Sequence, residues 1–163
     1  MSISFKIRNH FFSAFREFFV HHHSSLDFRA KIFALIIAAN EESEDRCYDI
    51  VKDISMQTYK NDEDRANLLM ISTKELVQKV KDNNGLDIDI LITHIQKEVK
   101  DVPRYAKKIE IEKLQRLTEA THDKDILSYQ ENILEFLQNL KNETLHTKRI
   151  QIEADEEKLE SKY

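Results

Sequence analysis

The chain is poor in the residues that interrupt helices. Its 163 residues include one glycine, one proline, one cysteine and no tryptophan. Because glycine and proline mark the tight turns between strands, their scarcity excludes a sheet with many short connections. The single cysteine, Cys47, excludes an intrachain disulfide and gives no sign of an exported, disulfide-stabilised domain. With 34% charged residues available for solvated helix faces, the composition predicts an all-α protein.

Long apolar runs and a clustered basic surface are also missing. The longest apolar run covers residues 32–39, far fewer than the roughly 20 residues that cross a bilayer. The N-terminus has no small-residue cleavage site of the kind that ends a signal peptide, so we expect a cytoplasmic protein. The formal net charge of −5 argues against nucleic acid as a partner, because neutralising phosphates requires clustered lysine and arginine.

Apolar residues spaced by three and four predict one domain of about seven helices. The expected helices lie at about residues 4–20, 26–39, 43–59 and 62–81, after Asp87, from Pro103 to about 120, and over residues 126–140. Asn61 and Asp87 are expected to cap the fourth and fifth helices, and Gly85 to take the left-handed conformation that ends the fourth. Three regions follow from this reading: a phenylalanine-rich amphipathic helix in 1–25, a helical domain in 26–141 and a charged helical tail in 142–163.

Two stretches of the chain are similar to one another. Each has an apolar helix that ends in alanine, a short acidic turn and a second amphipathic helix. A shift of 81 positions places Ile36 on Leu117 and Ala39 on Ala120. A shift of 83 places the apolar residues 50, 51 and 54 on 133, 134 and 137. Such a duplication predicts two pseudo-symmetric halves whose acidic turns lie side by side.

The paired turns resemble the TerB-like superfamily of tellurite-resistance proteins, which includes the N-terminal domain of membrane-anchored DjlA-type co-chaperones. In that family each half has a helix ending in alanine, an aspartate–glycine turn and a helix that opens with glutamate. The resemblance covers residues 26–141. It implies an all-α bundle that acts as a stress-associated binding module and binds metal ions through the carboxylates of its turns.

The chain departs from the family pattern at both turns. Asn40–Glu41 and Asp123–Lys124 stand where the family has aspartate–glycine, so both glycines are missing. Asp123 carries over as an acidic family position, and Glu131 lies at one of the two positions that match the later glutamate. This weaker acidic pattern counts against metal binding in this chain.

A divalent cation, calcium or manganese, is the cofactor that the acidic turns predict. Such hard cations need several oxygen ligands, which two converging turns can supply. The candidate ligands are Asn40, Glu41, Glu42, Glu44 and Asp45 from the first turn, and Asp123, Asp125 and Glu131 from the second. The alternative interpretation is that these acidic residues cap and complement the starts of the helices that follow. No ligand spacing matches a defined metal-binding loop, and both interpretations stay open.

The chain has no pattern of catalytic residues. It contains no nucleophile with a placed base, no glycine-rich phosphate loop and no paired-histidine motif, so we expect a binding module with a protein partner and not an enzyme. The alternative function is a peripheral membrane or protein–protein adaptor that docks through residues 5–20. Eight of the nine phenylalanines precede Ala34, and such a face can rest in a membrane interface or a partner's groove. The same spacing also fits a helix that covers the core.

Two further surfaces are open to more than one interpretation. Basic residues outnumber acidic ones between positions 97 and 116, which is typical of a solvated face or of a surface that docks an acidic partner. In the tail, Leu145, Ile152 and Leu159 recur every seven residues. One apolar residue per heptad is too narrow a stripe to predict a coiled coil. The sequence leaves the partner and the oligomeric state undetermined.

Overall fold

A computed structural model of the chain describes residues 24–162. Helices and turns make up this part of the chain and no strand occurs in it, which confirms the predicted all-α class. The elements are α2 (Ser24–Ala38), α3 (Arg46–Thr58), α4 (Glu63–Lys81), α5 (Ile88–Asp101), the 3₁₀ segment η1 (Pro103–Lys108), α6 (Ile111–Gln115), the 3₁₀ segment η2 (Arg116–Ala120) and α7 (Lys124–Glu160). The predicted helix at 4–20 lies outside the described residues.

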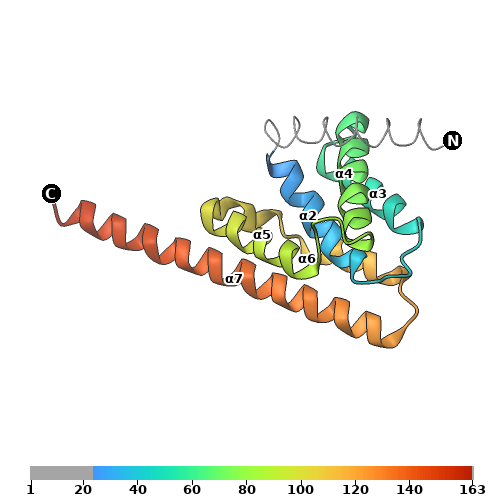
Figure 1. Cartoon of the computed structure of the whole chain (residues 1–163). Helices are drawn as coiled ribbons and strands as arrows, with labels where there is room; N and C mark the ends of the chain where they lie inside the picture. The colour runs from blue at the N-terminus through green and yellow to red at the C-terminus, as the bar shows by residue number, and fades with distance from the viewer. Residues whose placement is uncertain (1–23, 163) are drawn as a thin grey trace.

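Helix α2 is the centre of the core. Phe28, Leu35 and Ile36 are fully buried on it, and the helix is apolar on nearly every side, as buried helices are. Helices α4, α5 and α7 and the two 3₁₀ segments all pack against it (Figure 1). Burying a side chain of this size contributes roughly 1.5–3 kcal/mol relative to leaving it exposed. The longest apolar run of the sequence, residues 32–39, therefore lies at the centre of the fold.

The ends of α4 and α5 are set by local side chains. Asp87 caps α5 as predicted, and its carboxylate accepts a hydrogen bond from the Ile90 N–H at 2.7 Å. Gly85 has the predicted left-handed conformation, with a φ of 73°. The predicted cap of α4 is displaced by one residue, because Asn61 itself is left-handed, with a φ of 66°. Asp62 caps the helix in its place and accepts from the N–H of Arg65.

The prediction of one helix from Pro103 to about residue 120 is wrong. The backbone is extended at Ile109 and non-helical at Glu110, which separates η1 from α6, and a further 3₁₀ segment, η2, follows. Ile109 is fully buried, and its carbonyl accepts a hydrogen bond from Lys141 Nζ on α7 at 2.8 Å. The break leaves no buried polar group unpaired at Ile109, because its carbonyl bonds to Lys141 and its apolar side chain lies in the core.

Helix α7 runs for 37 residues without interruption. Its first half packs on the core through Ile133, Leu134 and Leu137, which are buried. Every residue from 151 to 160 is exposed, and Figure 1 shows the helix leaving the other elements and ending alone at the C-terminus. We call residues 145–160 the tail segment and residues 24–144 the body. Among the described helices, none combines the length and apolar character that crossing a membrane demands.

Candidate functional site

The two acidic turns lie side by side. The side-chain amide of Asn40, at the end of α2, donates to the hydroxyl of Thr121 at 3.5 Å. The Thr121 hydroxyl donates to the side-chain oxygen of Gln130 on α7 at 2.7 Å. The amide of Gln130 donates to the backbone carbonyl of Ile36 at 3.0 Å. These three bonds join the two turns, residues 40–45 and 121–125, which we call the rim.

Contacts between the two similar stretches follow the shift of 81 positions found in the sequence. Ser24 contacts the hydroxyl of Tyr105 at 2.7 Å, and Asn40 contacts Thr121 at the other end of α2. Between them, the Arg29 guanidinium donates to the Glu110 carboxylate at 3.3 Å. Helix α2 therefore runs parallel to residues 105–121. In each of the three pairs, the α2 residue contacts the residue 81 positions later in the chain.

Seven of the eight predicted cation ligands expose their side chains. The exception is Asn40, which is 7% exposed and whose side-chain oxygen accepts from the N–H of Glu42 at 3.1 Å. The exposed residues are Glu41, Glu42, Glu44, Asp45, Asp123, Asp125 and Glu131. Within residues 24–162, no three histidine, cysteine, aspartate or glutamate side chains are grouped so that they could hold a metal ion. Calcium or manganese binding at the rim stays a prediction.

The alternative role of these residues, helix capping, is seen at α7 and not at α3. The Asp123 carboxylate accepts from the N–H of Asp125 at 2.8 Å and from that of Ile126 at 3.1 Å. Two backbone donors that α7 leaves without a partner inside the helix are thereby satisfied. Asp45 holds the corresponding position before α3, but its side chain makes no capping hydrogen bond. In the second turn, Asp123 therefore acts as a helix cap.

A buried charge cluster links α2 to α5. Lys31 Nζ lies 3.0 Å from a carboxylate oxygen of Asp27 and 3.0 Å from one of Glu98. Asp27 is only 4% exposed. Burial raises the pKa of Glu98, and the neighbouring Lys31 ammonium partly opposes this rise. The spacing of Asp27 and Lys31 by four residues was visible in the sequence, but the approach of Glu98 from another helix was not.

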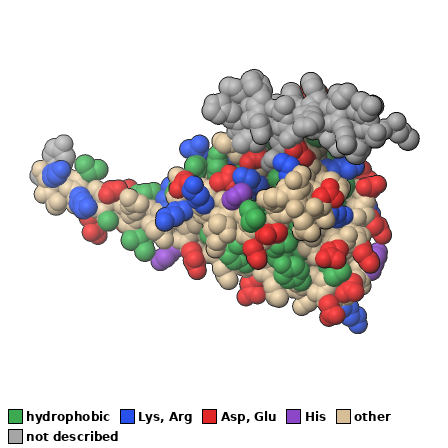
Figure 2. Space-filling view, in the orientation of Figure 1, with side chains coloured by type: hydrophobic (Ala, Val, Ile, Leu, Met, Phe, Trp, Pro, Cys, Tyr) green, Lys and Arg blue, Asp and Glu red, His purple; other side chains and the backbone are tan. Residues whose placement is uncertain are grey.

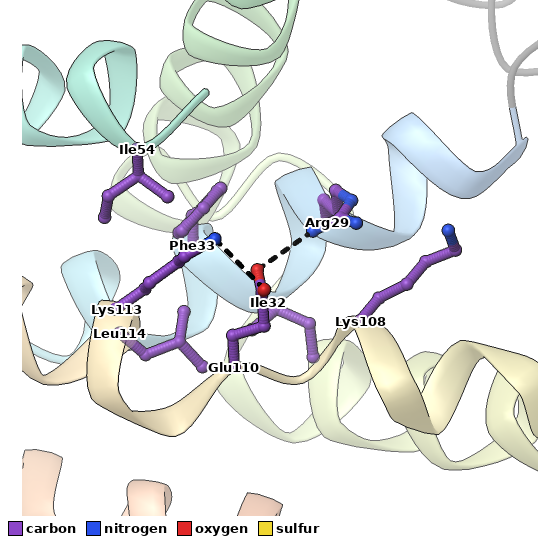
Figure 3. A pocket seen from close by; sticks show the side chains of 8 residues that line it. All are labelled: Arg29, Ile32, Phe33, Ile54, Lys108, Glu110, Lys113 and Leu114. Atoms are coloured by element: carbon purple, nitrogen blue, oxygen red, sulfur yellow. Dashed lines mark hydrogen bonds and ion pairs between the residues drawn. The ribbon is translucent and has the colours of Figure 1, made fainter. Parts of the chain in front are cut away.

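A second charged cluster lies at a shallow hollow between α2, α3 and α6 (Figure 3). The hollow is small, with a volume of about 10 Å³, which is room for about one water molecule. The Glu110 carboxylate accepts a hydrogen bond from Arg29 and another, at 3.0 Å, from Lys113. Lys108 lies at the edge of the hollow and makes no hydrogen bond to Glu110. Partial burial and the nearby Arg29 guanidinium lower the pKa of Lys108. With three basic side chains around one carboxylate, this hollow does not suit a divalent cation, and its ion pairs hold α2 against α6.

Comparison with known proteins yields no match. No family model, curated protein or solved structure matches the chain. Function is therefore inferred from the contacts of its own residues.

The one thiol and the joining residues complete the description of the site. Cys47 is 3% exposed, and burial raises its pKa, so the thiol is protonated and a poor nucleophile. Sequence reasoning gave Thr121 no role, and it identified Gln130 only as the other position, beside Glu131, that matches the later glutamate of the TerB-like pattern. A buried position on the apolar face of α7 gives no sign in the sequence that a glutamine there bonds to two distant segments.

Proposed function

We propose that this chain is a non-enzymatic binding module of TerB-like architecture and that its ligand is another protein. Support for the architecture comes from the contacts between residues 81 positions apart and from the joined turns at the rim. Both features would arise if a helical unit were duplicated and a pseudo-twofold axis, parallel to α2, related α2 to residues 105–121. The TerB-like resemblance associates such a unit with stress responses, including tellurite resistance.

The observation that carries the choice of a protein ligand is the exposure of the tail segment. Ile150, Ile152 and Leu159 are 53%, 49% and 59% exposed, the highest values among the exposed large apolar residues of residues 24–162. A helix of this length without packing is marginal in water, because helices in proteins depend on tertiary contacts for most of their stability. Covering these side chains with a partner would supply those contacts. The helix-in-groove and helix-to-helix modes of recognition both fit such a segment.

Site-specific photo-crosslinking tests this proposal. A photo-reactive amino acid replaces Ile152 in the tail segment, and a matched variant carries it at Ile71 on α4, which is 37% exposed. In cells that naturally produce the chain, we expect a discrete crosslinked protein band from position 152 and none from position 71. Equal labelling at both positions, or none at 152, would contradict a docking role for the tail segment.

Divalent-cation binding at the rim is a second hypothesis. The contact between Asn40 and Thr121 favours it, because it brings the two turns together. The carboxylates of the two turns weaken it, because within residues 24–162 no three of them are grouped so that they could hold an ion. A cation that binds only the folded chain must raise its melting temperature. Thermal melting in millimolar calcium or manganese is the test, with Asp123→Asn as the control that keeps a capping side chain and removes the charge. An unchanged midpoint at saturating ion would reject the hypothesis.

The alternative of docking through residues 5–20 concerns residues outside the described part of the chain. Flotation of liposomes with the full chain, compared with a chain that begins at Ser25, tests it. Flotation of the full chain alone would favour membrane contact through the phenylalanine-rich segment. Flotation of neither would leave protein docking as the proposed function.

A further inference from the structure

The apolar residues of the tail segment form a single stripe. Leu145, Ile152 and Leu159 are separated by seven residues, so they lie on one side of α7 at intervals of about 10 Å. Leu145 is half-buried and packs against the core where the tail segment begins. Ile152 and Leu159 continue the stripe into solvent. The stripe therefore starts on the body and extends beyond it without a described partner.

Charges along the tail segment are divided between its two ends. Residues 145–152 carry Lys148 and Arg149 and no carboxylate, whereas residues 153–160 carry five carboxylates and one lysine: Glu153, Asp155, Glu156, Glu157, Glu160 and Lys158. Residues three positions after a stripe residue share one flank of the helix, and residues four positions after it share the other. Lys148 and Asp155 therefore lie on one flank of the stripe, and Arg149 and Glu156 on the other.

This arrangement distinguishes between the two ways in which identical helices can pair. In an antiparallel pair with Ile152 opposite its own copy, the facing residues are Leu145 with Leu159, Lys148 with Asp155, and Arg149 with Glu156. A parallel pair would instead set Lys148 beside Arg149 of the second copy, and Asp155 beside Glu156. Opposite charges meet in the antiparallel arrangement, and like charges meet in the parallel one. Such flanking charges decide the orientation of paired helices.

A basic surface lies beside the start of the tail segment. Helix α5 and η1 pack against α7 and expose Lys97, Lys100, Arg104 and Lys107. Figure 2 shows lysine and arginine side chains, with acidic ones among them, on the body next to the point where the tail segment leaves it. In an antiparallel pair, this surface of one copy would lie near the tip of the other, where Glu157 and Glu160 alternate with Lys158 and Lys162. The tip therefore adds no net attraction, and the charges of residues 148, 149, 155 and 156 decide the orientation.

We propose that the partner of the tail segment is a second copy of this chain, bound antiparallel with Ile152 at the twofold axis. This inference rests on the proposed function, in which the tail segment is a docking element, and it names the protein that docks. Three apolar residues per copy cover a small area, so the dimer is weak and depends on concentration. Its charge pairs are exposed, so it weakens as salt increases.

Sedimentation velocity of the full chain over a range of concentrations and two salt concentrations tests the proposal. We expect a monomer–dimer equilibrium that shifts toward monomer at high salt. Ile152→Asp places two carboxylates at the twofold axis and should weaken the dimer by about tenfold or more. Ile71→Asp, an equally polar change on the exposed face of α4, should leave the equilibrium unchanged. A monomer at every concentration and salt condition would overturn the proposal.

Charge exchange tests the orientation. Lys148→Glu with Arg149→Glu sets like charges against Asp155 and Glu156 and should weaken the dimer by about tenfold. Adding Asp155→Lys and Glu156→Lys to the same chain restores opposite pairs in the antiparallel arrangement only, so association should return. Failure of this fourfold variant to associate would overturn the antiparallel assignment. Circular dichroism of each variant checks that the helices persist.

Disulfide crosslinking provides an independent measure of the geometry. Ile152→Cys should form an interchain disulfide readily, because residue 152 meets its own copy. Leu159→Cys should not, because Leu159 faces Leu145, and the native Cys47 is buried and unreactive. Equal crosslinking at 152 and 159 would indicate a parallel pair and overturn the proposal. A photo-crosslink from position 152 to a different protein, with the purified chain monomeric, would reject self-association and retain the proposed protein-binding function.

Discussion

At the scale of single residues, Gln130 links α7 to α2 and to the second turn of the rim. It is 2% exposed, and both ends of its side-chain amide are used, one by the Ile36 carbonyl and one by the Thr121 hydroxyl. A buried polar group is costly unless it is hydrogen-bonded, and a half-satisfied network is worse than none. The glutamine therefore stabilises this arrangement of the rim in preference to others.

Replacing Gln130 with methionine should destabilise the fold. The side chain keeps its length and loses its hydrogen bonds, which takes the donor from the buried Ile36 carbonyl and costs about 1–3 kcal/mol. Urea denaturation measures the free energy of unfolding. Gln96→Met, on the exposed face of α5, is the control and should change it by less than about 0.5 kcal/mol. Equal stability of the two variants would show that the Gln130 bonds contribute nothing.

Glu98 should make stability depend on pH in an unusual direction. Its pKa in the folded chain lies above the ordinary value of 4.5, chiefly because it is buried. The folded state therefore binds this proton more tightly than the unfolded state. The associated stability is fully present below about pH 4.5 and is lost as pH rises through the folded-state pKa.

The matched variant is Glu98→Gln, which keeps the shape of the side chain and an acceptor for Lys31. Below about pH 4.5 the two proteins should have similar free energies of unfolding, and once the pH exceeds the folded-state pKa of Glu98 the variant should be the more stable. Urea denaturation across this pH range measures the difference. If the original chain gained stability over the variant as pH rose, attraction between Glu98 and Lys31 would outweigh the cost of burying the carboxylate.

At the scale of elements, the start of α7 depends on its cap. Asp123→Ala removes an acceptor for two backbone N–H groups and should lower the free energy of unfolding by about 1 kcal/mol. Asp123→Asn retains a good capping side chain and should cost much less. Thermal or urea denaturation of both variants measures the effect. A large loss in the asparagine variant would mean that the negative charge matters more than the hydrogen bonds.

Apolar spacing predicts the buried face of a helix but not the residue at which a helix breaks. The apolar spacing of residues 47, 51 and 54, and of 91, 95 and 99, predicted the buried faces of α3 and α5 correctly, because a helix face repeats every three to four residues. The same spacing predicted one helix after Pro103, where the chain forms three short segments. At the break, the Ile109 side chain is buried and its carbonyl accepts a hydrogen bond from Lys141. No local pattern contains a partner 32 residues away.

At the scale of the whole molecule, the body and the tail segment should be energetically separate. A chain that ends after His146 loses residues of α7 that are exposed, apart from the half-buried Lys148, so in dilute solution its melting temperature should lie within about 2 °C of that of the full chain. Differential scanning fluorimetry at low concentration makes the comparison. A large decrease would show that the tail segment stabilises the body within one chain.

The sequence alone determined the helical class and most of the helix positions. Composition and apolar spacing are properties of neighbouring residues, so both can be interpreted without knowing which distant residues meet. The tertiary structure decided which of the predicted acidic ligands is a cap, where residues 103–120 break, and that Gln130 joins the rim. The cap is a local bond from the N–H groups of residues 125 and 126, for which the sequence left two interpretations open. The other two depend on hydrogen bonds between atoms brought together only by folding, and residue order alone does not specify such partners.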